Sequence, residues 1–304
     1  MIRIVFWCFL LSSMAISSYG EQIPPFKFDW GSEKLSITVG GKPFADYCYE
    51  VPRAGFINVF SPAGIKVTRN YPPQQGDDID HPHHSGIFLT FGDLNGIDFW
   101  HIHGKVLQDE VIDEGKVGVS GHGFSVKKRF LANDEQSTLL SEACRFTLRV
   151  VTDGYLLEYD STFTCEAERV VIGSKEEGGL GVRVATPMTV KYGGKMKDDT
   201  GRQGGTQIWG KQANWVEHSA NVDGMHVGLT MMVHPDNFSN CWWHARDYGV
   251  NAANPFGPLN DRDKRTRMQR GDRLRMRYAI LVHSHENARQ YDAAVAYERY
   301  IKGD

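Results

Sequence analysis

One pattern recurs along most of the chain: short runs of alternating or β-branched residues, each followed by a turn signal. The turn signals include Gly40-Gly41, Asp153-Gly154 and Asp223-Gly224, which supply the bends that hairpins need. This rhythm favours an antiparallel sheet over a helical bundle or a parallel α/β fold. The runs span residues 35–39, 55–60, 87–91, 145–151, 155–164, 182–185, 227–233 and 274–282.

We therefore predict an all-β fold, a large antiparallel β-sandwich, with one C-terminal helix. Ser284 could cap that helix over 285–301, with Tyr291, Ala294, Val295 and Ile301 on the stripe that packs on the sheet edge. No repeat or linker divides the chain, so residues 21–304 are expected to form a single domain. The segment 251–267 is expected to be a long loop.

The first twenty residues are typical of a cleaved secretory signal, because Arg3 precedes an apolar run and small residues lead to Gly20. We expect a mature chain that is periplasmic or secreted. No later run approaches the roughly 18 apolar residues of a spanning helix, so no membrane span is expected after cleavage. The net charge of −3 gives no electrostatic reason to expect nucleic acid as a partner.

Four cysteines remain once Cys8 leaves with the signal, an even number that permits disulfides in an exported chain. A hairpin at 152–154 would set Cys144 opposite Thr162 and turn Cys165 to the other face, which disfavours a bridge between those two. Free, buried thiols are therefore favoured, and the pairing stays open. The four are Cys48, Cys144, Cys165 and Cys241.

Five of the twelve histidines lie between positions 81 and 103, next to three aspartates at 77, 78 and 80. Imidazoles titrate near neutrality and commonly bind metals, so the cluster indicates either an acid/base site or a metal site. If Gly92–Gly96 turns a hairpin, Ser85 faces His103 and Ile87 faces His101. The proton-transfer candidates are His81, His83 and His84; the candidate ligands of a divalent metal are His81, His83, His101 and His103.

Two later segments suit a sugar ligand. On an extended strand Arg183 shares its face with Gly181 and Ala185, whose small side chains would leave open space around the guanidinium. Glu176 and Glu177 at the start of that strand could act as general base or orient a hydroxyl, and Glu177 is the catalytic candidate. Residues 241–257 mix aromatic rings with donors and acceptors, although one of Trp242 and Trp243 must turn inward. The substrate-binding candidates are Arg183, Trp243, His244, Arg246, Asp247 and Asn254.

Several blocks together resemble a family of exported bacterial proteins known as PmoA-like: 80–87, 92–100, 177–185, 209–211 and 246–257. The resemblance covers most of the mature chain and implies a fold akin to the large sandwiches of sugar mutarotases and polysaccharide lyases, in bacteria that degrade complex glycans. Ser85 stands where that family often has arginine, which argues against an anion-binding role there. The family's name comes from a methane mono-oxygenase subunit, an integral membrane protein, so a chain without a membrane span does not inherit that activity.

The leading functional hypothesis is an exported carbohydrate-active enzyme that uses His/Glu acid/base chemistry on a glycan or modified sugar. Hydrolysis, elimination and epimerisation all remain open. One alternative is a non-catalytic glycan-binding module in which Trp209, Trp242 and Trp243 stack on sugar rings. The other is a metal-dependent enzyme that uses the histidine cluster.

Overall fold

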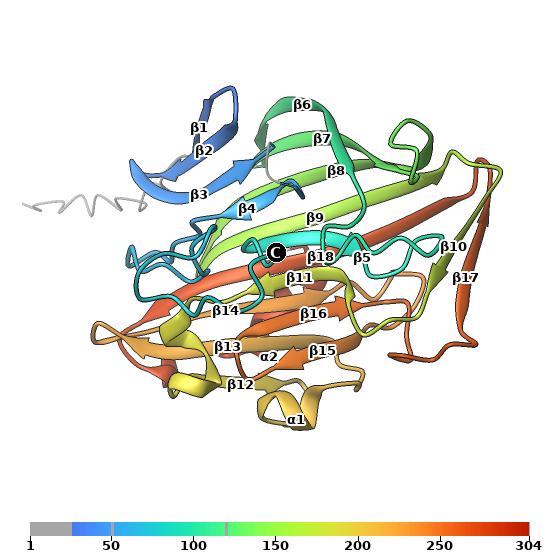
Figure 1. Ribbon diagram of the computed structural model, residues 1–304. Coiled ribbons are helices and arrows are strands. Elements are labelled where there is room, and N and C mark those ends of the chain that lie inside the picture. Colours follow the sequence, from blue (N-terminus) through green and yellow to red (C-terminus); the bar gives the residue numbers. More distant parts are fainter. Residues whose placement is uncertain (1–25, 50–51, 119–120, 304) are drawn as a thin grey trace, which may run out of the picture.

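The computed structural model describes residues 26–49, 52–118 and 121–303. It contains two large antiparallel sheets that pack face to face, which confirms the predicted sandwich (Figure 1). The predicted signal segment, residues 1–20, lies outside the described residues. In the described part, no helix has both the length and the apolar character needed to cross a membrane.

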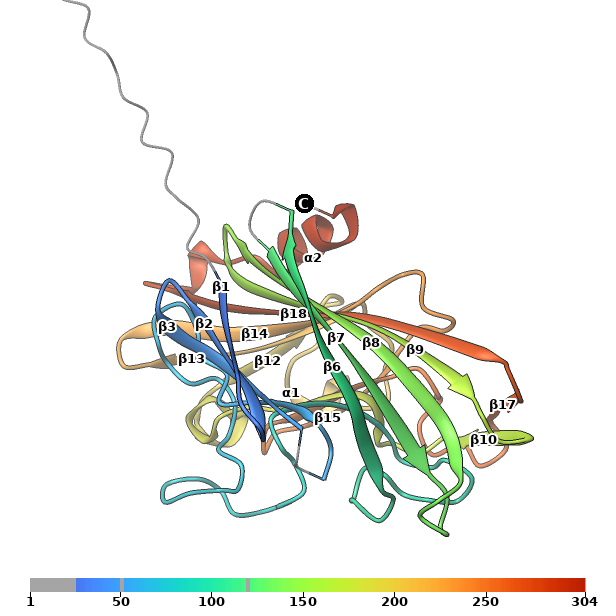
Figure 2. The same ribbon diagram turned by 90° about the horizontal axis from the view of Figure 1, so that it is seen from above.

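The first sheet has the strand order β1 (Phe26–Trp30), β2 (Lys34–Val39), β3 (Lys42–Cys48), β4 (Gly55–Ile57), β5 (Ile87–Phe91), β11 (Gly178–Arg183), β16 (Val250–Asn254) and β15 (Trp242–Arg246). The second sheet has the order β12 (Lys195–Asp198), β13 (Trp215–Val222), β14 (Met225–Val233), β18 (Arg273–His285), β9 (Gly154–Cys165), β8 (Thr138–Val151), β7 (Gly121–Leu131) and β6 (Val106–Val117). A separate ribbon pairs β10 (Arg169–Gly173) with β17 (Arg265–Gln269). In Figure 2, seen from above, β1, β2 and β3 of the first sheet lie to the left of the long strands β6, β7, β8 and β9 of the second sheet.

One apolar core lies between the two sheets, because the strands alternate inward apolar residues with outward ones. Aromatic rings join the layers: Phe56 of β4 meets Phe146 of β8 at 5.1 Å, and Phe91 of β5 meets Phe163 of β9 at 5.1 Å. Each buried phenylalanine contributes about 1.5–3 kcal/mol through loss of apolar surface from water.

The C-terminal helix is present, but its predicted start is wrong. Strand β18 continues through His285, and α2 spans Ala293–Lys302 with Asp292 as its cap, since that carboxylate accepts from the Ala294 and Val295 N–H groups. The helix packs on the outer face of the second sheet rather than on its edge. Its buried residues are Ala293, Ala296 and Tyr300, whereas the predicted Val295 and Ile301 are exposed.

The four cysteines are free and buried, as favoured from the sequence. The predicted register of Cys144 is wrong by one residue, because the turn after β8 contains two residues and Cys144 pairs with Ser161 instead of Thr162. Both thiols then point into the same core. They are still too far apart for a bridge, since Cys165 is opposite Leu140, four residues or about 13 Å along β8 from Cys144. The predicted long loop 251–267 is also partly wrong, because β16 occupies its first four residues.

Candidate functional site

The candidate site lies on the outer face of the first sheet, across β5, β11, β16 and β15. The register sets Phe88, Gly181, Ala252 and His244 in one row across these strands. Gly181 leaves room for rings: a Cβ there would stand 2.9 Å from both the Phe88 and the Trp100 ring. The expected open space around Arg183 is therefore not found beside Gly181, because Trp100 and Phe88 fill it.

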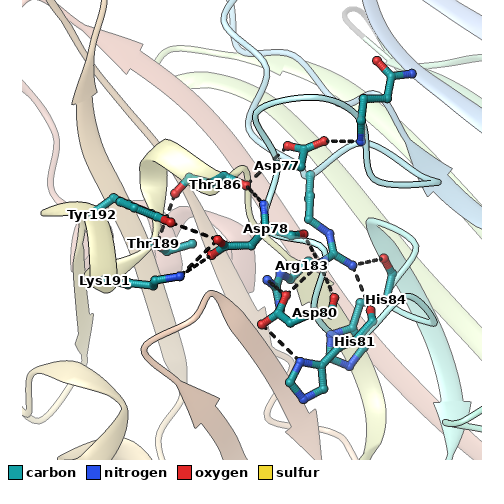
Figure 3. Close-up of polar contacts among 12 residues, drawn as sticks. Asp77, Asp78, Asp80, His81, His84, Arg183, Thr186, Thr189, Lys191 and Tyr192 are labelled. Carbon is teal, nitrogen blue, oxygen red and sulfur yellow. Dashed lines mark hydrogen bonds and ion pairs between the residues drawn. The ribbon is translucent and has the colours of Figure 1, made fainter.

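A single arginine holds the loop that carries three of the histidines. Arg69 is fully buried and donates to the carbonyl oxygens of Asp78, Asp80, His81 and His84 at 3.0, 2.6, 2.9 and 3.3 Å. Figure 3 shows Asp78, Asp80, His81 and His84 of this loop. A guanidinium offers five donors in a rigid fork, so one side chain can fix several turns of irregular backbone.

Two buried guanidinium groups share one carboxylate in this loop. The Asp80 Oδ1 accepts from Arg183 at 2.5 Å and from Arg69 at 3.0 Å, while its Oδ2 lies 3.2 Å from the His81 Nδ1 (Figure 3). Arg183 is only 1% exposed, and its charge lies 4.9 Å above the Tyr248 ring. Buried charges need partners, and Asp80 is the carboxylate that both guanidinium groups share.

The imidazoles of this loop lie in ring-to-ring contact and reach solvent, and we call His81, His84, His83 and His101 the histidine row. The His81 ring is parallel to those of Tyr248 and His84 at 4.4 and 5.2 Å, and the Tyr248 and His84 rings are themselves 6.4 Å apart. His84 is buried and meets His83 at 4.4 Å, and His83 meets His101 at 4.6 Å. The His81 and His101 side chains are 39% and 38% exposed, so a ligand can reach both ends of the row.

Burial keeps the middle of the row neutral. It lowers the pKa of His83 to about 3, helped by the nearby charges of His101 and Arg53, and it lowers the pKa of His84 as well. Within the described part of the chain, the His83 Nε2 has no hydrogen-bond partner. At neutral pH, the His83 ring is therefore uncharged, and its Nε2 is a buried atom without a partner.

His101 is the imidazole best placed to transfer a proton. Its Nδ1 lies 2.9 Å from the Asp98 Oδ2, and its backbone N–H donates to the Asp98 Oδ1 at 2.9 Å. Burial alone would raise the pKa of Asp98, but the hydrogen bonds from His101 outweigh it and hold that pKa below its usual range. An ionised carboxylate on Nδ1 orients the ring and leaves Nε2 as the acceptor, as in catalytic dyads.

Glu176 organises the other half of the site. Its Oε2 accepts from the Trp209 Nε1 at 2.9 Å and from the Arg246 guanidinium at 2.6 Å, and the His244 Nδ1 lies 3.5 Å away. The His244 imidazole, ahead of Arg246, lowers the pKa of Glu176 to about 2. This carboxylate is thus ionised at neutral pH and suits binding rather than proton donation.

Trp100 joins the two halves. Its ring centroid lies 5.6 Å from His84 and 6.1 Å from His244, edge-on to both. Arg246 in turn lies over the Trp209 ring at 5.2 Å. The histidine row and the Glu176 group therefore pack against the same buried ring.

Glu177 is half-buried immediately before β11. Burial mainly, with smaller contributions from the Asp80 and Glu177 charges, raises the pKa of Tyr248 to about 12. The Glu177 carboxylate is therefore close enough to the Tyr248 phenol to act on it through its charge. Its catalytic role stays a prediction.

Three of the predicted substrate-binding residues have structural contacts instead. Trp243 is fully buried in the core between the sheets and donates to the Ala213 carbonyl at 3.0 Å, so the prediction that it contacts a sugar is wrong. The Asp247 Oδ1 accepts from the Gly205 N–H at 2.6 Å, at the start of the short helix α1 (Gly204–Ile208). Asn254 is buried, where its amide bonds the backbone of residues 175 and 256.

The predicted hairpin between the two histidine groups is also wrong. Strand β5 pairs with β11 and β4, whereas residues 98–104 form turns rather than a strand. His103 is exposed, with its ring 6.2 Å from that of His101. Across residues 26–49, 52–118 and 121–303, no three or more His, Cys, Asp or Glu side chains are grouped to hold a metal ion. The geometric reason for a metal on His81, His83, His101 and His103 is therefore lost.

The sequence reasoning missed five residues that shape the site: Arg53, Arg69, Asp98, Trp100 and Tyr248. Arg53 is buried and donates to the carbonyl oxygens of His83 and Trp100, which ties the two histidine groups together. Asp98 and Trp100 lie in the block 92–100 and Tyr248 in the block 246–257, so a signal existed for these three. Nothing in the local sequence marks Arg53 or Arg69, because their partners are backbone carbonyls of distant segments.

A model of the family of unknown function DUF6807 matches residues 34–297. The chain belongs to this family. The PmoA-like name is not part of the family's description, so the match supports only the coarser expectation of a family whose function is unknown. No curated protein matches the chain in sequence.

Among solved structures, the chain is similar to an α-galactosidase of Geobacillus stearothermophilus at 10% identity and a TM-score of 0.44, covering 84% of this chain and 40% of the galactosidase. A galactose mutarotase related enzyme from Lactobacillus acidophilus is similar at 6% identity and a TM-score of 0.35, and the match covers 85% of this chain and 97% of that enzyme. The heparan sulfate lyase HepC of Pedobacter heparinus is similar at 7% identity and a TM-score of 0.37, and the match covers 88% of this chain and 36% of the lyase. The chain thus spans about two fifths of the galactosidase. We draw the function from the site itself, because similarity this distant carries no argument.

Proposed function

We propose that this chain is a carbohydrate-active enzyme that uses histidine acid/base chemistry on the outer face of the first sheet. The observation that carries the proposal is the His101–Asp98 pair, set 4.6 Å from the neutral His83 ring at a solvent-accessible edge. An oriented imidazole beside a second, uncharged one is what proton abstraction and return require.

The proposed chemistry starts at His101. Its Nε2 takes a proton from a sugar hydroxyl or from a carbon next to a carbonyl, and Asp98 stabilises the imidazolium that forms. The same nitrogen then returns the proton to the leaving oxygen, whereas in an epimerisation a second group on the opposite side of the carbon delivers a proton to the other face. The Glu177 carboxylate is the second proton-transfer group, and the buried charge of Arg183 favours negative charge that develops on the sugar.

The sugar-binding part of the proposal rests on the composition of the surface. A pyranose ring offers apolar faces that stack on aromatic rings and hydroxyls that need both donors and acceptors. Trp209 is half-buried and supplies an aromatic ring, while Glu176 accepts and Arg246 donates. This mixture surrounds the histidine row on one side of the molecule.

The test is turnover on a panel of oligosaccharides that includes oxidised keto sugars, followed by NMR and mass spectrometry. His101→Gln should reduce the rate by about 10²–10⁴-fold, the usual contribution of a general acid or base. Asp98→Asn should reduce it less, because the ring keeps its place but loses its orienting charge. The matched control is His103→Gln, an exposed neighbour that should leave the rate unchanged. Absence of product on every sugar, or a His101→Gln variant with full activity, would contradict the proposal.

A glycan-binding module is the alternative that the same surface supports, because Trp209 carries a cation over one ring face at the accessible edge. Calorimetry on the same panel separates the two. Binding without product, lost in Trp209→Ala and retained in His101→Gln, favours the module. Turnover that depends on His101 favours the enzyme.

The proposal places the enzyme in the periplasm or the medium, as the composition of residues 1–20 suggests. Intact-mass measurement of protein recovered from the periplasmic fraction checks this. Cleavage close to Gly20 supports export. A chain that keeps its first twenty residues in the cytoplasmic fraction contradicts it.

A further inference from the structure

The outer face of the second sheet contains a cavity of 310 Å³ that the proposed chemistry does not use. It lies over β12, β13 and β14, and Ala288 and Tyr291 of the segment before α2 form one wall. In Figure 1 these strands lie in the lower left part of the picture, near α2. At about 30 Å³ per water, the cavity has room for roughly ten waters, which is the scale of one sugar ring.

The register of the strands explains why polar groups meet there. Lys195 is opposite Ser219 and Lys197 is opposite Glu217 across β12 and β13, and Asn221 is opposite His226 across β13 and β14. Residues two apart on a strand share a face, so all six point to the same side of the sheet. The six polar residues of the cavity lining on these strands are Lys195, Lys197, Glu217, Ser219, Asn221 and His226.

A buried carboxylate forms part of the cavity lining. Glu217 is 2% exposed, and its Oε2 has the Lys197 ammonium group at 3.0 Å as an ion-pair partner. Among the described residues, no group completes a well-formed hydrogen bond to this oxygen. The nearest imidazole nitrogen, the His283 Nε2, stays 3.8 Å from Oε1. The Oε2 atom is itself buried, so Oε1 is the oxygen that can accept from a hydroxyl in the cavity, because an ionised carboxylate has about four acceptor positions.

The charge of the lining is positive. Lys197 is neutralised by Glu217, whereas Lys195 has no carboxylate within ion-pair distance among the residues that the structure describes. Burial lowers the pKa of His226, so this ring is neutral near pH 7, and its Nδ1 lies 3.4 Å from the Asn221 Oδ1. The lining therefore combines one surplus cation with several neutral donors and acceptors.

We infer that this cavity binds a sugar acid of one ring, with its carboxylate on Lys195 and its hydroxyls on Glu217, Asn221 and His226. The surplus cation selects one negative charge. The neutral donors and acceptors select hydroxyls, which both donate and accept. The site lies on the opposite outer face from the histidine row, so it is separate from the proposed catalytic surface.

The experiment is titration calorimetry of the full-length protein with sodium D-glucuronate, D-glucose and acetate. Glucuronate should saturate one site, while glucose lacks the charge and acetate lacks the hydroxyls, so each should bind at least about tenfold more weakly. Lys195→Ala and Asn221→Ala change exposed residues and should each weaken glucuronate binding by about tenfold. The matched control is Lys42→Ala, an exposed lysine on the other sheet, which should leave binding unchanged.

His101→Gln separates this inference from the proposed function. Glucuronate binding that survives His101→Gln and falls in Lys195→Ala supports the second site, whatever the outcome of the turnover assay. Binding lost in His101→Gln assigns the ligand to the histidine row and overturns the inference. Absence of saturable binding, equal binding of glucose, or full binding in Lys195→Ala overturns it too.

Discussion

The outer faces of the two sheets both carry buried histidines, but those of the first sheet lie on a loop and that of the second lies within a strand. On the first sheet the imidazoles belong to a loop fixed by Arg69, and the row ends at the accessible His101 with its carboxylate partner. On the second sheet His283 lies within β18, fully buried and stacked under Tyr291 at 3.7 Å. Burial lowers the pKa on both faces. The first face combines uncharged rings with the His101–Asp98 pair at an open edge, so we expect proton chemistry there and binding on the other face.

The largest expected effect comes from removing the arginine that fixes the loop. Arg69→Leu should lower the free energy of unfolding by about 3–5 kcal/mol, because it strips the loop carbonyls and Asp80 of a buried donor. Urea unfolding measures this. The control is Arg275→Leu, which breaks an exposed pair with Asp160 on the second sheet and should cost at most about 1 kcal/mol. Equal costs for the two variants would show that Arg69 does not hold the loop.

Two glycines allow a matched test of the two faces. A Cβ at Gly181 would meet the Phe88 and Trp100 rings at 2.9 Å, and one at Gly228 would meet the His283 ring at 2.5 Å and a backbone oxygen at 2.8 Å. Each alanine variant should cost about 1–3 kcal/mol, with Gly228→Ala the costlier, because backbone yields less than a side chain. Only Gly181→Ala should also slow sugar turnover, since Trp100 supports His84. Lost turnover in Gly228→Ala alone would reverse the assignment of the faces.

The pH dependence of stability should reveal the buried imidazole of the row. Burial holds the pKa of His83 at about 3, against 6.5 for an ordinary imidazole, so the unfolded chain takes up this proton first as the pH falls. Its contribution is complete above pH 6.5 and is lost progressively between pH 6.5 and about 3. In His83→Gln the urea midpoint should therefore fall less between pH 7 and 4.5 than in the wild type. The control is His103→Gln, an exposed residue whose variant should show the same fall of the urea midpoint with pH as the wild type. If the midpoint of His83→Gln also falls as much as that of the wild type, the predicted effect of burial on His83 is contradicted.

The smallest expected effect on stability belongs to two arginines of similar exposure, one on each sheet. Arg246 pairs with Glu176 and is 36% exposed, and Arg129 pairs with Asp109 and is 38% exposed. Each alanine variant should change the free energy of unfolding by no more than about 1 kcal/mol. Arg246→Ala should nevertheless weaken sugar binding severalfold in calorimetry, and Arg129→Ala should not. Identical sugar affinities would remove Arg246 from the proposed binding surface.

Much of the fold was predictable, because alternation reports directly which residues face a core. The run Ile87–Phe91 coincides with β5, and the hairpin of β8 and β9 was placed to within one residue. The register error of one residue nevertheless put Cys165 on the wrong face of the sheet in the prediction, since the side-chain period of a strand is two. The start of α2 was misplaced because Ser284 resembles a cap, whereas its hydroxyl accepts from the Ala63 N–H in the fold.

The site was predictable in its ingredients but not in its contacts. The histidine cluster and the Arg246 segment were identified from residue types alone, and His83 does lie beside His101. The predicted hairpin that was meant to bring them together does not exist; Arg53 and Trp100 do so, through contacts between distant segments. Alternation could not decide which of Trp242 and Trp243 faces the core, because both faces of that strand are covered.

The position of β11 sets the order in which this molecule can assemble. Its two neighbours, β5 and β16, are both distant from it along the chain, whereas β6, β7, β8 and β9 follow one another as hairpins. Local pairings form early and distant ones late, because each long loop must close before its contacts form. We therefore expect Phe88 and Trp100 to stay uncovered on a nascent chain until residue 254 has been made. During that interval, their apolar surface is a binding site for chaperones and a route to aggregation.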